Sequence, residues 1–202
     1  MTRSKLDRRT SAYPSARGRL VAAALVAGCL ALSAASASAR TVVVRYTPFT
    51  ATGEIDPAFS VTHGGSAMCT GSNVTGRSDA WRCYEGSRVR DPCFGNADSA
   101  TAVCPRSGPW SASVVILDAS FDTQFQGSAT SGPVWALTTA TRRCAASSGA
   151  GPMPRGGHIA RYYCDRSSLV WGSLDRRRAT WRALVGGLHG PLRWQNVRTA
   201  WR

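Results

Sequence analysis

The sequence predicts a mainly β protein, built as a small disulfide-stabilised sandwich or barrel of short antiparallel strands. Three observations support this fold class. Beyond residue 40, no stretch keeps the apolar period of a helix. Short apolar runs flanked by Gly, Pro, Ser or Asp recur instead, as they do in all-β domains. Six cysteines are spread through the same region, a spacing that is typical of a disulfide framework in a small exported domain.

The first forty residues have the pattern of an export signal. Six basic residues and only Asp7 precede an uncharged apolar run over 20–35, and Ala37-Ser38-Ala39 then offers the small residues that a signal peptidase recognises. The run is shorter than the roughly 20 apolar residues of a spanning helix. We therefore expect no spanning helix in the mature chain, and we assign 1–39 to a signal peptide, 40–44 to an N-terminal stub and 45–202 to a single disulfide-bonded β domain.

Lipidation at Cys29 is an alternative to cleavage after Ala39. The segment Val26-Ala27-Gly28-Cys29 is similar to a bacterial lipobox, in which the cysteine is lipidated and becomes the new N-terminus. Leu30, Ala31 and Leu32 continue the apolar run, whereas lipoproteins usually turn polar after this cysteine. A secreted or otherwise extracytoplasmic protein is therefore the main prediction, and a lipoprotein anchored to the membrane through Cys29 is the alternative.

Strand signals follow one another along the second half of the chain. Ser113–Leu117 is rich in β-branched residues and lies between Gly108-Pro109 and Asp118. Residues 41–45 are either a first strand or a stub. We expect further strands, each flanked by turn residues, over 134–139, 159–163, 169–174, 179–185 and 193–201.

The cysteines that remain after the leader are even in number. An exported protein meets an oxidising environment, so all six are expected in three disulfides, and none is left as a free nucleophile or metal ligand. Six cysteines allow 15 pairings. They are Cys69, Cys83, Cys93, Cys104, Cys144 and Cys164.

A short internal repeat narrows these pairings. Residues 81–89 and 162–170 both read aromatic-x-Cys-x-x-small-Ser-x-Val, and each half also has a strand-like segment before an earlier cysteine. The match is short, and the pairing stays open if it arose by chance. If the repeat is a duplication, the pairs are Cys69 with Cys83, Cys144 with Cys164 and, from the two that remain, Cys93 with Cys104.

Several kinds of chemistry are excluded or unsupported. Lys5 is the only lysine, which removes phosphate-binding loops, Schiff-base enzymes and S-x-x-K nucleophiles from the body of the chain. The motifs H-E-x-x-H, G-x-S-x-G and C-x-x-C are absent. We expect a non-enzymatic protein with no cofactor, no metal and no catalytic residue. The alternative is a cell-envelope hydrolase whose site is assembled in space from His63, His158 or His189 beside Asp or Ser.

Positive charge is the one functional signal in the mature chain. From residue 40 onward there are 19 arginines and 10 carboxylates, and Arg82, Arg88 and Arg90 cluster in the first half. Guanidinium groups bind phosphate bidentately and stack on aromatic rings. In the competing interpretation, the arginines form a solvated charged face and the tryptophans belong to the core. The predicted partners are an anionic cell-wall polymer or lipid head groups, not nucleic acid, and the candidate binding residues are Trp171, Arg176, Arg177, Arg178 and Trp181.

The cysteine framework resembles that of a group of exported, cysteine-rich actinobacterial proteins of unknown function. The resemblance covers about residues 66–202 and rests on Gly76-Arg77-Ser78-Asp79-Ala80-Trp81-Arg82-Cys83, Asp91-Pro92-Cys93-Phe94, Val103-Cys104-Pro105, Arg143-Cys144 and Tyr162-Tyr163-Cys164. It implies a secreted or envelope-attached domain and implies no mechanism. Within this framework, Arg77 and Asp79 are expected to form an ion pair that fixes the loop before Cys83.

Overall fold

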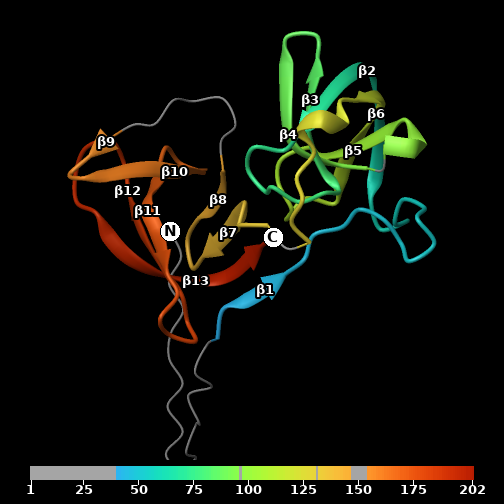
Figure 1. Cartoon of the computed structure of the whole chain (residues 1–202). Coiled ribbons are helices and arrows are strands. Elements are labelled where there is room, and N and C mark those ends of the chain that lie inside the picture. Colours follow the sequence, from blue (N-terminus) through green and yellow to red (C-terminus); the bar gives the residue numbers. More distant parts are fainter. Residues whose placement is uncertain (1–39, 96, 131, 147–153) are drawn as a thin grey trace, which may run out of the picture. The chain divides into compact units, whose positions relative to one another are not determined.

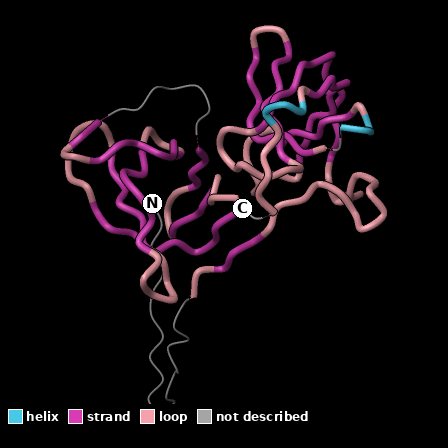
Figure 2. Tube along the Cα trace, viewed as in Figure 1, coloured by secondary structure: helices cyan, strands magenta, loops and turns pink. Residues whose placement is uncertain are grey.

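The computed structural model describes residues 40–95, 97–130, 132–146 and 154–202. The expected signal peptide over 1–39, including Cys29, lies outside the described residues. Within them the chain is mainly strand, with two short 3-10 turns, η1 (Ala97–Ser99) and η2 (Thr123–Phe125) (Figures 1 and 2). The predicted β class is confirmed. No helix in this part of the chain has the length and apolar character needed to cross a membrane.

The described strands close into two small barrels instead of a sandwich. We call them barrel 1 and barrel 2. Barrel 1 contains β2 (Ser60–Gly71), β3 (Ala80–Glu85), β4 (Arg88–Phe94), β5 (Thr101–Pro105) and β6 (Ser113–Phe121). Barrel 2 contains β7 (Ala136–Thr139), β8 (Arg143–Ala146), β10 (His158–Cys164), β11 (Leu169–Asp175), β12 (Arg182–Gly186) and β13 (Arg193–Trp201).

The number of strands in each barrel decides how it closes. Consecutive strands of barrel 1 are antiparallel neighbours, so chain direction alternates and the first and fifth strands point the same way. β2 and β6 therefore pair in parallel along most of their length. Barrel 2 has six strands, and the same alternation makes β7 and β13 antiparallel. Closure protects strand edges that an open sheet of this size would expose.

Residues 42–44 of the segment predicted as an N-terminal stub form a strand. β1 (Val42–Val44) pairs in parallel with the end of β13, and Figure 1 shows the two side by side. Thr41 is buried beside it: its Oγ1 donates to the Val197 carbonyl at 2.7 Å and accepts from the Trp181 N–H at 2.8 Å. These bonds tie the start of the described chain to barrel 2. The short β9 (Pro154–Arg155) pairs with β10.

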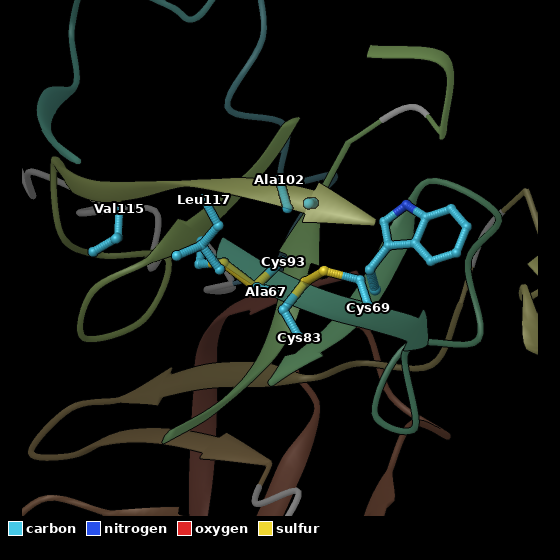
Figure 3. Close-up of a cluster of buried hydrophobic side chains, with 10 residues drawn as sticks. Ala67, Cys69, Cys83, Cys93, Ala102, Val115 and Leu117 are labelled. Carbon is cyan, nitrogen blue, oxygen red and sulfur yellow. A yellow bond between two sulfur atoms is a disulfide. The ribbon is translucent and has the colours of Figure 1, made fainter. Parts of the chain in front are cut away.

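Two disulfides occupy the centre of barrel 1. The sulfur atoms of Cys83, Cys93 and Cys104 all lie within 4.8 Å of one another, and they take up volume that larger side chains would otherwise fill. Most other residues of this core are small or medium-sized, as dense packing requires, and Trp81 is the large exception. Figure 3 shows this core, in which Cys69, Cys83 and Cys93 lie among Ala67, Ala102, Val115 and Leu117.

Three disulfides join the six cysteines of the described residues: Cys69–Cys83, Cys93–Cys104 and Cys144–Cys164. The expected disulfides are confirmed, and their pairing is the one that the internal repeat indicated. Cys69 and Cys83 are directly opposite each other on β2 and β3, and Cys144 and Cys164 are opposite each other on β8 and β10. The matching cysteines of the repeat therefore hold equivalent cross-strand positions, one in each barrel.

Arg77 joins the loop before β3 to distant parts of the chain. Its guanidinium donates to the main-chain oxygens of Tyr46 and Arg202 at 2.9 and 2.8 Å, and it lies 4.8 Å from the centre of the Phe94 ring. The same group forms the expected ion pair with Asp79. Burial alone would raise the pKa of Asp79, but the hydrogen bond and charge of Arg77, with the charge of Arg45, hold it below its usual value.

The buried carboxyl group of Asp91 should make the stability of the protein depend on pH. Burial raises the pKa of this carboxyl to about 6, although Ser72 Oγ and the Asn73 N–H donate to it. The folded protein therefore holds a proton that the unfolded chain releases near pH 4. We expect this contribution to stability to be complete below about pH 4 and to be lost as the pH rises through 6.

Urea unfolding midpoints between pH 4.5 and 7.5 measure this effect. The wild-type midpoint should fall across the interval, and the midpoint of Asp91→Asn should change less. Asp79, Glu85 and Asp175 have lowered pKa values, so they contribute stability that is lost only when the pH falls below their unfolded values near 4. A wild-type midpoint that stays constant from pH 4.5 to 7.5 would contradict the assignment to Asp91.

Candidate anion-binding surface

The three consecutive arginines predicted to bind a ligand lie in the loop between β11 and β12, and all are exposed. Arg177 is paired with Asp175 through two hydrogen bonds of 2.9 and 3.1 Å, and Arg182 donates to the same carboxylate at 2.9 Å. The hydrogen bonds from Arg177 and Arg182 hold the pKa of Asp175 far below its usual value. One carboxylate thus compensates two of the nearby cations, while Arg178 forms no ion pair with any described residue.

The two tryptophans predicted beside this loop are not free stacking platforms. Trp171 is 1% exposed, and its Nε1 donates to the Gly186 carbonyl at 3.0 Å. A ligand-stacking role for Trp171 therefore does not fit its place in the core, which agrees with the competing interpretation from the sequence. Trp181 is half-buried against the core of barrel 2, and the Arg176 guanidinium lies 4.7 Å from its ring centre.

One aromatic side chain of this surface was missed by sequence reasoning. Trp194 of β13 is 50% exposed, and the Arg182 guanidinium lies 5.2 Å from its ring centre. Its signal was available in the strand predicted over 193–201, where Trp194 and Val197 fall on opposite faces by strict alternation. Trp194 and the arginine loop are joined through Arg182 and Asp175 on adjacent strands.

Charge is divided unequally between the two barrels. Residues 40–132, which include barrel 1, contain seven arginines and eight carboxylates. Residues 133–202, which include barrel 2, contain twelve arginines and two aspartates. The net positive charge of the chain beyond the leader region therefore belongs to barrel 2. Barrel 1 is close to neutral, and its Arg90 is paired with Glu85 at 2.8 Å.

The three histidines do not form a catalytic arrangement among the described residues. His63 is on β2, His158 is on β10, and His189 is in the loop between β12 and β13; all three are exposed. His63 and Glu85 line one hollow of about 340 Å³. The Glu85 carboxylate, however, accepts from Arg90 and from the Gly65 N–H. No hydrogen bond joins His63, His158 or His189 to a carboxylate in the described part of the chain.

The cysteines offer neither a nucleophile nor metal ligands in this state. The three sulfur atoms that lie within 4.8 Å of one another in barrel 1 would be near enough to share a metal ion. All three are in disulfides, and metal binding or nucleophilic attack requires a thiolate. Their contribution in this oxidised form is to the core of barrel 1.

Comparisons with known proteins give no relative: no family model, no curated protein and no solved structure matches the chain.

Proposed function

We propose that the protein is an exported, non-enzymatic domain that binds an anionic ligand of the cell envelope through barrel 2. The ligand is either a cell-wall polymer or a layer of lipid head groups. One observation carries the proposal: the excess arginines are concentrated on barrel 2, and barrel 1 is close to neutral. A patch of one sign of charge attracts polyanions over a distance of about 10 Å at moderate salt.

Export has its own support. The leader has the basic, apolar and small-residue regions of a signal peptide. The three disulfides are of the kind that persists in an oxidising, extracytoplasmic environment. The hydrolase alternative lacks a comparable observation, because the histidines lie in three separate elements.

Co-sedimentation with purified cell wall and with anionic vesicles tests the proposed function. We expect the protein to bind at least one of them and to dissociate as salt rises. Arg176→Gln/Arg178→Gln should weaken binding moderately, because it lowers the positive charge of barrel 2. The matched control is Arg88→Gln/Arg106→Gln, which removes two exposed charges from barrel 1 and should have little effect. No binding at low salt, or equal weakening by both pairs, would refute the assignment to barrel 2.

A further inference from the structure

Two adjoining hollows form a groove on barrel 2, away from the arginines predicted from the sequence. Their volumes are about 760 and 530 Å³, and they share Ala140, Thr141 and Arg198. We call them together the arginine groove. The turn between β7 and β8 lines both hollows, and residues 195–199 of β13 run along the groove. Because three residues line both hollows, the two hollows are neighbours on the surface of barrel 2.

Five arginines from four segments of the chain line the groove: Arg40 before β1, Arg142 and Arg143 at the start of β8, Arg166 in the β10–β11 turn, and Arg198 on β13. Asp165 is the only carboxylate in its lining. None of the five is in an ion pair with a described residue, and the groove arginines differ in this respect from Arg177 and Arg182. Their charge is therefore available to a ligand.

The groove also presents hydrogen-bond donors. The buried Nε of Arg142 makes no hydrogen bond with a described residue. Gln195 uses its Oε1 to accept from the hydroxyl groups of Thr139 and Thr141 at 2.8 and 3.4 Å, so its amide NH₂ is the part that can donate to a ligand. Guanidinium and amide groups together suit a ligand rich in acceptor oxygens.

Arg166 reaches the groove from a tight turn. Arg166 and Ser167 have φ values of 55° and 56°, the left-handed pair of a hairpin turn. This turn places Arg166 in the lining of the groove.

We propose that the arginine groove binds a linear polymer carrying phosphate groups. The inference rests on the proposed function and names the site and chemistry of its ligand. The oxygens of a phosphate group are arranged tetrahedrally, so guanidinium groups can donate to them from several directions at once, whereas the two oxygens of a carboxylate lie in one plane. Arginines that converge from four segments without carboxylate partners fit phosphate better. Two adjoining hollows fit successive groups along a chain.

Calorimetric titration with inorganic polyphosphate of defined length tests the groove, with polygalacturonate of matched charge as the carboxylate probe. The groove variant is Arg166→Gln/Arg198→Gln. The control is Arg161→Gln/Arg193→Gln, which removes two exposed charges from the same barrel outside the groove. We expect polyphosphate to bind more tightly than polygalacturonate, the groove variant to weaken its Kd at least about tenfold, and the control to weaken it less than about threefold.

Each other outcome has a defined meaning. Equal weakening by the two variants would overturn the groove, while salt-dependent wall or vesicle binding by the wild type would leave the proposed function standing. Tighter binding of polygalacturonate would overturn the phosphate assignment. A wild-type protein that binds neither wall nor vesicles would refute the proposed function itself. Thermal melts of all variants separate lost binding from lost folding.

Discussion

Replacing Arg77 by methionine should lower the free energy of unfolding by about 3 to 5 kcal/mol, because hydrogen bonds from a charged group contribute about 1.5 to 3 kcal/mol each. Arg77 is 1% exposed, and its guanidinium contacts Asp79, two main-chain oxygens and the Phe94 ring. Methionine retains much of the apolar contact with Phe94. The expected loss therefore comes from the polar partners.

Three acceptors lose a hydrogen bond in this variant. The Tyr46 carbonyl loses the Arg77 guanidinium, the Arg202 carbonyl still accepts from the Tyr46 N–H at 3.1 Å, and Asp79 keeps Arg45, whose Nη2 lies 3.2 Å from it. An acceptor left unsatisfied in a buried place costs about 1 to 3 kcal/mol. The pKa of Asp79 should rise as well, because Arg77 supplies the main opposing effect to its burial.

Arg45→Met is the matched control. Arg45 binds the same carboxylate, but its side chain is 57% exposed, and exposed ion pairs contribute about 0 to 1 kcal/mol. Urea unfolding of both variants at pH 7 gives the comparison. If Arg77→Met cost no more than Arg45→Met, the contacts of Arg77 would not be holding the loop before β3 to the rest of the chain.

Removing the Cys69–Cys83 disulfide should have an effect of similar size. Cys69→Ala/Cys83→Ala opens a loop with a sequence separation of 14. The unfolded chain then gains conformational entropy, which lowers the free energy of unfolding by about 3 kcal/mol. Both sulfur atoms also leave the core of barrel 1, where the two residues are fully buried. The cavity adds to the loss.

The site of that loss can be observed by hydrogen exchange. Cys69 and Cys83 contribute to the core cluster of barrel 1, and Cys144 belongs to a separate cluster in barrel 2. Exchange should therefore accelerate over 60–121 and change less over 133–202. Cys144→Ala/Cys164→Ala is the reciprocal control, with acceleration expected in the second range. Uniform acceleration by either variant would mean that the two barrels open together.

Strands with local signals were predictable from the sequence. The run predicted over 193–201 is β13, and that over 169–174 matches β11 to one residue. β4 gave no such signal, because it contains Pro92 and charged residues, which are depleted in strands. Pro92 is accommodated where the pairing of β3 and β4 shifts register. The cysteine pairing was accessible because the repeat is local.

Closure into two barrels was not predictable, because it depends on pairing between distant strands such as β2 and β6. For the same reason, the sequence did not reveal which arginines form ion pairs with carboxylates and which do not. The consecutive arginines 176–178 were conspicuous in the sequence, yet Asp175 and Trp181 already engage two of them. Arg40, Arg166 and Arg198 are far apart in the sequence and share a groove only through the fold.

The pairing of β1 with β13 has a consequence for the order in which the molecule is completed. A ribosome makes the chain from its N-terminus, so β1 is the first described strand to be synthesised and its partner is the last. Thr41 and Val197, joined by a hydrogen bond, are 156 positions apart. The β1–β13 pairing can therefore form only after β13 has been added, and it closes one of the longest loops of the chain.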